Sequence, residues 1–113
     1  MQISELQKLI IDFRDARDWS QFHNPKDMTA ALAIEAAELQ EKFLWKSVEE
    51  SYEIGKNNPE VADELADVFA YMLGLAEVCE IDLGQALIDK MEKNEVKYPV
   101  EKSKGTVTKY TKL

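Results

Sequence analysis

Apolar residues recur along most of this chain at spacings of three and four, the period of an amphipathic helix. The first such run consists of Leu6, Leu9, Ile10 and Phe13. The segment from Ser4 to Gln7, at the start of this run, has the pattern of a capping box. We therefore predict a first helix over residues 4–17.

Two Asn-Pro pairs, Asn24-Pro25 and Asn58-Pro59, mark the next helix starts, because asparagine is a good N-cap and proline suits the first helical position. They predict a second helix over residues 25–45 and a third over residues 59–80.

A fourth helix begins after Asp82 as its cap and ends near Tyr98-Pro99, where proline stops continuation. The segment from Lys46 to Asn57 is polar and contains Gly55, so it is expected to be a loop, with or without a helical turn. The tail, residues 99–113, is expected to be extended or irregular, and no strand pair is convincing.

These elements predict an all-α fold, a four-helix bundle completed by dimerisation. A pair of helical hairpins completed by a second subunit is the alternative. The third helix favours an oligomer, because its apolar residues cover more than half its circumference and need cover on several sides. They are Val61, Leu65, Val68, Phe69, Met72, Leu73, Leu75, Ala76 and Cys79.

Composition narrows the class of protein. The chain has 113 residues, 45% hydrophobic and 32% charged, which fits one soluble domain. No apolar run approaches the ~20 residues needed to span a bilayer, so we expect no membrane partner. No secretory signal is visible in Met1–Ile10. The single cysteine, Cys79, cannot form an internal disulfide, and a reduced, cytoplasmic setting fits.

Charge is unevenly distributed. The net charge is −8, yet residues 97–113 contain five lysines and one glutamate, a net of +4, which leaves −12 on residues 1–96. An acidic body argues against a general nucleic-acid surface. The basic tail indicates either a local anionic partner or a solvated chain end.

Certain acids fall where apolar residues are expected. On the second helix, Glu35 lies in the middle of the apolar arc and Glu38 at its edge. On the third helix, Glu64 lies inside the apolar arc and Asp67 at its edge. If the two helices pack antiparallel, the four carboxylates converge.

Converging carboxylates are unfavourable unless a cation neutralises them. An all-oxygen ligand set selects Mg²⁺, with Mn²⁺ as the alternative, over zinc. The competing interpretation is that these acids are exposed and paired with lysines, as Glu38 and Lys42 would be at a spacing of four.

Other residues could bind the phosphates or the base of a ligand held at such a metal site. On the fourth helix, Lys90, Lys93, Asn94 and Lys97 form one stripe, either a solvated face or a phosphate clamp. Trp19 and Trp45 bracket the second helix; they are core by default, but their flat faces also suit base stacking. His23, in the turn before Pro25, is expected to form hydrogen bonds within that turn rather than to act as a catalytic base.

Glu35-x-x-Glu38, then 25 residues, then Glu64-x-x-Asp67, resembles the signature of the MazG-like all-α nucleotide pyrophosphohydrolases. Further segments are similar to the dCTP pyrophosphatase branch of that family and cover nearly the whole chain in order. They are Arg17–His23, Phe43–Ser47, Lys97–Val100, Ser103–Gly105 and Lys109–Thr111.

The resemblance implies roles for individual residues. The catalytic and metal-binding acids would be Glu35, Glu38, Glu64 and Asp67. Trp19 and Trp45 would stack on the base with His23 nearby, and Tyr71 would lie at the sugar. The residues expected near phosphates are Lys90, Asn94, Tyr98, Lys104, Lys109 and Tyr110. Residues 1–98 would be the helical catalytic domain, and residues 99–113 a basic tail contributing to the same domain.

The implied activity is hydrolysis of a nucleoside triphosphate, dCTP or a modified dCTP, to the monophosphate and diphosphate, which would clean the nucleotide pool. The family resemblance also implies a homo-oligomer, a tetramer formed as a dimer of dimers. Two other functions compete: a non-catalytic helical interaction module that needs no metal, and a nucleotide-binding regulator without turnover. Four intact acids argue against the regulator.

Overall fold

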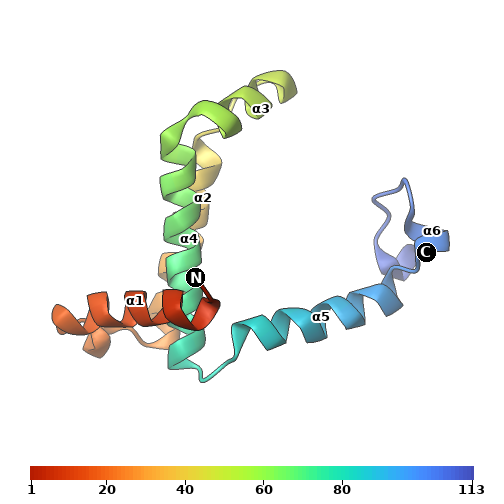
Figure 1. The fold of residues 1–113 in the computed structure, drawn as a ribbon. Coiled ribbons are helices and arrows are strands. Elements are labelled where there is room, and N and C mark those ends of the chain that lie inside the picture. Colours follow the sequence, from red (N-terminus) through yellow and green to blue (C-terminus); the bar gives the residue numbers. More distant parts are fainter. The chain divides into compact units, whose positions relative to one another are not determined.

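Helices form all the regular structure of residues 1–113, which the computed structural model describes in full (Figure 1). In chain order the elements are α1 (Ile3–Ala16), η1 (Ser20–Phe22), α2 (Pro25–Glu41), α3 (Val48–Asn57), α4 (Pro59–Val78), α5 (Leu83–Lys97), α6 (Val100–Ser103) and η2 (Tyr110–Lys112). The predicted all-α fold class is confirmed, with six α-helices rather than four.

The chain divides into two compact units, Met1–Ile81 and Asp82–Leu113. No helix is long and apolar enough to cross a lipid bilayer.

The three predicted N-caps are confirmed. The side chains of Asn24, Asn58 and Asp82 accept hydrogen bonds from backbone N–H groups in the first turns of α2, α4 and α5, at 2.9, 2.9 and 3.0 Å. Each cap satisfies an amide that has no partner within its helix, which is why these starts could be identified from sequence.

The capping box predicted at Ser4 is wrong. Helix α1 begins one residue earlier, at Ile3, and its N-cap, Gln2, makes no side-chain cap. The backbone amides of Glu5 and Leu6 bond instead to the Gln2 carbonyl oxygen at 3.0 Å. Ser4 therefore lies inside the first turn, where its side chain cannot act as the cap.

The loop predicted over residues 46–57 is also wrong, because α3 occupies most of it. Ser47 and Glu50 form a reciprocal capping box that starts this helix. A glycine within a helix costs only about 1 kcal/mol, so Gly55 did not prevent it. Correspondingly, α2 ends at Glu41 instead of continuing to Trp45, whose φ of 62° is incompatible with a right-handed helix.

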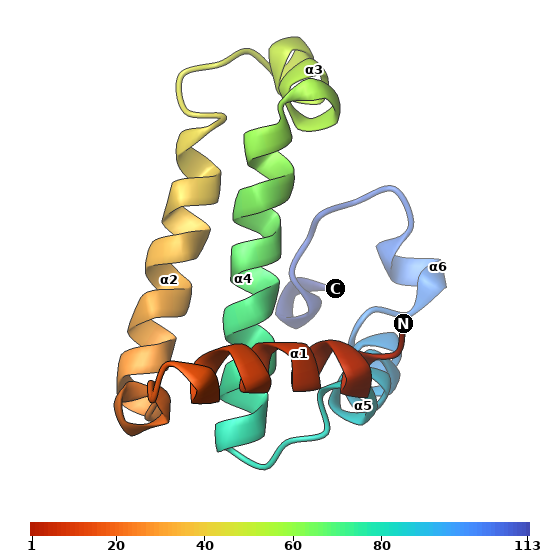
Figure 2. The ribbon, with the colours of Figure 1, turned by 60° about the vertical axis from the view of Figure 1, so that its left-hand side comes forward.

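Within the first unit, α2 and α4 pack side by side and antiparallel, and α1 crosses α4 (Figures 1 and 2). The small core between them contains Met28, Val61, Leu73 and Ala76. The Arg14 guanidinium forms a 2.6 Å ion pair with Glu77, which ties α1 to α4.

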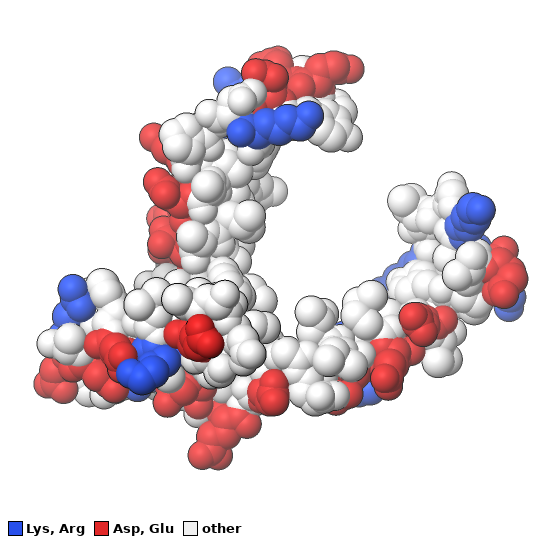
Figure 3. Space-filling model, viewed as in Figure 1, with Lys and Arg blue, Asp and Glu red and all other residues white.

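One side of α4 remains apolar and exposed. Leu65 is 56% exposed, and Phe69 and Met72 are each 38% exposed. Figure 3 shows an uncharged surface over α4, with acidic side chains along its left edge and both acidic and basic side chains above it near α3. We call this surface the α4 apolar face; it is lined by Ala62, Leu65, Ala66, Val68, Phe69 and Met72.

The second unit contains α5 and the tail. The tail was predicted to be extended or irregular, which is wrong over α6 and η2. The rings of Tyr98 and Tyr110 meet edge to face with centroids 5.8 Å apart, and the Lys97 ammonium lies 4.8 Å from the Tyr110 ring centre. These contacts fold the tail back onto the end of α5.

Candidate functional site

The antiparallel packing of α2 and α4 brings acids from both helices together. One carboxylate oxygen each from Glu35, Glu64 and Asp67 lies within 4.8 Å of the other two. Glu35 and Glu64 are half-buried, and Asp67 is exposed. The convergence predicted from the helical arcs is thus present for these three acids.

Glu38 belongs to the same electrostatic neighbourhood, although it does not share the 4.8 Å cluster. It lies one turn after Glu35 on α2 and is half-buried. Burial raises the pKa of Glu35, and the nearby carboxylate of Glu38 raises it further. Burial likewise raises the pKa of Glu64, again with a contribution from Glu38.

One oxygen of Glu35 and one of Glu64 lack a hydrogen-bond partner. Oε2 of Glu35 and Oε2 of Glu64 are both buried and accept no hydrogen bond. The neighbouring cation, Lys42, pairs with Glu60 at 2.9 Å and only partly offsets the raised pKa of Glu64. The interpretation that the acids are exposed and paired with lysines therefore fails for Glu35 and Glu64.

The donor set fits a hard divalent cation. Buried carboxylate oxygens without partners are expensive unless a positive charge or a proton satisfies them. The cluster offers only carboxylate oxygens and contains no histidine or cysteine. Oxygen ligands are the ones that Mg²⁺ and Mn²⁺ prefer. Glu35, Glu64 and Asp67, with Glu38 beside them, are the residues that would hold such an ion.

The raised pKa values predict an unusual pH dependence for the metal-free protein. The ordinary value is 4.5, and folding raises the pKa of Glu35 and of Glu64 above it. As pH rises through these raised values, the unfolded chain has already lost protons that the folded protein retains. Both groups therefore stabilise the folded protein fully below pH 4.5. This stabilisation is lost as pH rises through their raised pKa values.

This effect is measurable as a difference between two proteins. Urea unfolding of metal-free wild type and Glu35→Gln, followed from about pH 4 to about pH 8, should show the variant gaining stability relative to wild type as pH rises. A difference that stays constant across that range would contradict the raised pKa of Glu35.

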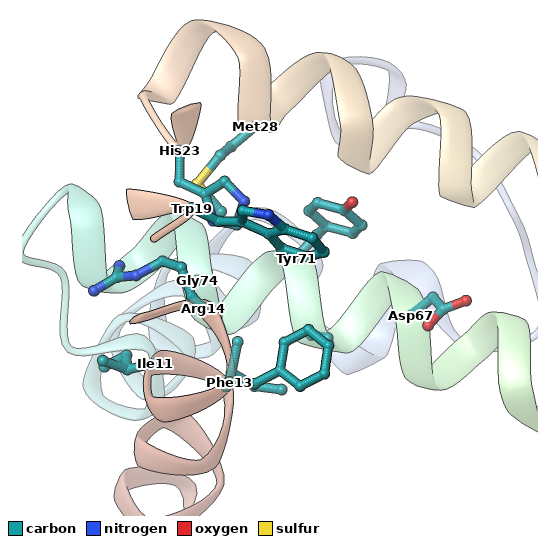
Figure 4. A pocket seen from close by; sticks show the side chains of 11 residues that line it. Ile11, Phe13, Arg14, Trp19, His23, Met28, Asp67, Tyr71 and Gly74 are labelled. Atoms are coloured by element: carbon teal, nitrogen blue, oxygen red, sulfur yellow. The ribbon is translucent and has the colours of Figure 1, made fainter. Parts of the chain in front are cut away.

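An apolar pocket of about 300 Å³ lies next to the acids (Figure 4). It is lined by Ile10, Ile11, Phe13, Arg14, Trp19, His23, Met28, Asp67, Ala70, Tyr71 and Gly74. Helices α1, α2 and α4 and the turn around η1 all contribute to it. It therefore forms only when these elements pack together.

Aromatic rings define the middle of this pocket. In Figure 4 the Trp19 and Tyr71 rings occupy the middle of the view, with His23 and Met28 toward α2 and Phe13 toward α1. Trp19 meets Phe13 edge to face at 5.9 Å between centroids, and its ring centre lies 6.4 Å from that of His23. A flat ring held this way presents a face to a planar ligand.

The pocket and the acid cluster share a boundary on α4. Asp67 belongs to both. Tyr71, one turn on, lines the pocket, and its pKa is raised by burial and then by Glu35 and Asp67. A ligand in the pocket would therefore extend directly to the carboxylates.

Trp45, a candidate for base stacking, does not line the pocket. Trp19 precedes the N-terminus of α2, whereas Trp45 follows its C-terminus and is 92% exposed. The six candidates for phosphate binding all belong to the second unit, where Tyr98 and Tyr110 contact each other. They are Lys90, Asn94, Tyr98, Lys104, Lys109 and Tyr110.

The sequence did not single out several pocket residues. The sequence places Phe13 only in the apolar stripe of α1, and it suggests no role for Met28. Gly74 offered one usable signal, a glycine in the middle of a long apolar helix, which often marks a close approach. Arg14 had no signal, because its partner Glu77 is distant in sequence.

Three comparisons with known proteins agree. Residues 30–113 match the model of the MazG-like family. The chain is 40% identical to dCTP pyrophosphatase 1 of Mus musculus over 98% of this chain and 67% of the relative. It is 37% identical to dCTP pyrophosphatase 1 of Homo sapiens, with the same coverage.

Its fold is similar to that of a solved structure. A pyrophosphatase from Archaeoglobus fulgidus DSM 4304 superposes with a TM-score of 0.80 and 44% sequence identity. The match covers 85% of this chain and 91% of that one. Sequence and fold therefore point to the same group of proteins.

Proposed function

Because this chain belongs to the MazG-like family, we propose that it is a Mg²⁺-dependent nucleotide pyrophosphohydrolase that converts dCTP and water to dCMP and diphosphate. The observation that carries the proposal is the shared boundary of the two sites. The acid cluster, in which Glu35 and Glu64 each have a buried oxygen without a partner, adjoins the aromatic pocket at Asp67. A nucleotide needs both features, a flat apolar site for its base and a cation for its phosphates.

The acids would hold the ion and handle the proton of the reaction. Glu35, Glu38, Glu64 and Asp67 are the proposed ligands. A bound Mg²⁺ would lower the pKa of a water molecule and neutralise charge on the phosphate chain. The water oxygen bonds to the α-phosphorus while the bond from the α-phosphorus to the bridging oxygen breaks. Diphosphate leaves with that oxygen, and one of the carboxylates accepts the proton of the water.

The pocket would hold the nucleoside. Trp19 would stack on the base with His23 at its side, and Tyr71 would lie at the sugar between base and phosphates. The apolar lining excludes water around the base and orients the α-phosphorus toward the carboxylates.

The remaining candidates would act on the phosphates or come from a second copy. Lysines and polar groups of the second unit, Lys90, Asn94, Tyr98, Lys104, Lys109 and Tyr110, would stabilise charge on the leaving diphosphate. Trp45 would stack on the base from a neighbouring subunit of a dimer or tetramer. Removal of excess or modified dCTP in a reducing, cytoplasmic setting is the expected biological use.

The direct test is an assay of diphosphate release. Purified protein with dCTP and MgCl₂ should release dCMP and diphosphate, and excess EDTA should abolish the release. A panel of common and methylated nucleotides should place dCTP or its 5-substituted forms first. Full activity in EDTA would refute the metal mechanism, and no turnover of any nucleotide would favour a non-catalytic module.

The α4 apolar face predicts an oligomer that a single charge disrupts. Replacing the 56% exposed Leu65 by Asp buries a carboxylate in the proposed interface, so the protein should dissociate into smaller species by light scattering. The matched control, Leu65→Met, conserves volume and should assemble as wild type does. A wild-type protein that is monomeric and fully active at micromolar concentration would contradict this prediction.

A further inference from the structure

Gly74 is a glycine that its backbone does not require. It lies inside α4, four residues before the helix ends at Val78, and it is buried. Gly105 is the only glycine with positive φ, so conformational freedom does not explain Gly74. An interior helical glycine is unfavourable relative to alanine, so packing must account for it.

Met28 supplies that packing. Its side chain from α2 is 3% exposed, and its terminal methyl lies 2.8 Å from the position that a Cβ at residue 74 would occupy. That distance is shorter than two carbon atoms tolerate, so the methyl of Met28 stands where a side chain at residue 74 would begin. The missing side chain lets the terminal methyl of Met28 approach α4 at residue 74.

This contact closes one end of the pocket. The pocket residues of α4 are Asp67, Ala70, Tyr71 and Gly74, a single stripe along the helix. Asp67 and Gly74 are seven residues apart, about 10 Å along the axis. Figure 4 shows Asp67 toward one side and Gly74 with Met28 toward the other. With phosphates at the acids, the base end of a nucleotide faces Met28 and Gly74.

We propose that Gly74 is a positioning residue that sets the depth of the base pocket through Met28, and that this depth admits a pyrimidine and rejects a purine. The inference rests on the proposed function. A methyl group at residue 74 would displace the flexible end of Met28 into the adjoining open volume, the pocket. The pocket volume of about 300 Å³ is at the lower end of the range for ligand sites, about 300–1,000 Å³, which suits a single-ring base.

The first experiment is Gly74→Ala. Its KM for dCTP should rise about tenfold with kcat changed less than about threefold, because base binding is impaired while the acids are untouched. The matched control is Gly55→Ala in α3, where an added Cβ meets Phe43 at an ordinary 3.9 Å. The control should raise the melting temperature by about 4 °C and leave KM unchanged.

Rescue separates a pocket effect from a general packing effect. Leucine ends one atom short of the Met28 methyl and has a similar volume, so Gly74→Ala combined with Met28→Leu should return the KM for dCTP to within about threefold of wild type. Two independent packing defects would instead add. A double variant no better than Gly74→Ala would overturn the proposal.

The opposite change tests specificity. Met28→Ala removes the side chain that closes the base end of the pocket, which leaves room for a purine. The ratio of kcat/KM for dATP to kcat/KM for dCTP should therefore rise about tenfold or more. An unchanged ratio in a folded Met28→Ala protein would overturn the proposal, even if Gly74→Ala failed to fold.

Calorimetric binding of dCMP without metal distinguishes this inference from the proposed function. If wild type hydrolyses no nucleotide, the proposed function fails, yet Gly74→Ala should still weaken dCMP binding about tenfold. If the dissociation constant of Gly74→Ala for dCMP stays within about threefold of the wild-type value, the role of Gly74 is rejected while the hydrolase proposal stays intact.

Discussion

The Glu35→Gln variant should lose at least about 100-fold in turnover of dCTP while the metal-free protein melts at the same or a higher temperature than metal-free wild type. We expect activity and stability to move in opposite directions, because Glu35 would be a ligand of the proposed Mg²⁺. In the metal-free protein it is instead a half-buried carboxylate with one unpartnered oxygen. Its Oε2 atom is buried without a hydrogen-bond partner, and burial, followed by the neighbouring carboxylates, raises its pKa. Glutamine keeps the shape and removes one negative charge from that cluster.

Added Mg²⁺ provides an independent measurement. Stabilisation by a ligand follows its affinity for the folded state, so wild type should gain more melting temperature from Mg²⁺ than Glu35→Gln does. This comparison needs no substrate. Two thermal melts, with and without Mg²⁺, and one diphosphate assay complete the experiment.

The matched control is Glu41→Gln, at the exposed C-terminal end of the same helix. Surface substitutions of this kind usually change stability by less than about 0.5 kcal/mol, and this one should leave turnover and the response to Mg²⁺ unchanged. If Glu35→Gln retains near wild-type turnover, the carboxylate site is not the catalytic centre.

Replacing Trp19 by Ala should raise the KM for dCTP about tenfold or more, with a smaller effect on kcat. Base–aromatic stacking contributes about 1–3 kcal/mol, and Trp19 is the ring that the pocket holds against Phe13 and His23. The matched control is Phe22→Ala, an aromatic residue of the same turn that is 61% exposed and does not line the pocket. A KM equally affected by both substitutions would assign the effect to the turn rather than to stacking.

Trp45→Ala tests whether a second subunit completes the pocket. Trp45 is 92% exposed, so its loss should leave the melting temperature of a dissociated subunit unchanged. In the assembled protein we expect nucleotide binding to weaken more than folding does. An unchanged KM together with a collapsed melting temperature would make Trp45 an interface residue and not a base-stacking one.

Local chemistry explains which elements could be predicted. The starts of α2, α4 and α5 depend on one side chain meeting an amide two or three residues away, so Asn24, Asn58 and Asp82 identify them from sequence. The same logic was available for α3 at Ser47 and Glu50. Polarity and Gly55 argued for a loop there, although a capping box outweighs one glycine.

The acids were also predictable, because helical periodicity alone places Glu35 and Glu64 inside apolar arcs. A carboxylate at such a position is expensive in any packed structure. The pattern therefore indicated a cation site before any distance between the helices was known.

The sequence by itself determined the helical class, three of the helix starts, the family and the acids of a candidate metal site, because each depends on residue type and on contacts within a few positions. Only the tertiary structure decided that Glu35, Glu64 and Asp67 meet within 4.8 Å, that Trp19 and not Trp45 lines the pocket, and that Met28 lies against Gly74. These outcomes depend on how helices distant in sequence pack against one another. That packing is set by the sum of many weak contacts, which no local pattern along the chain records.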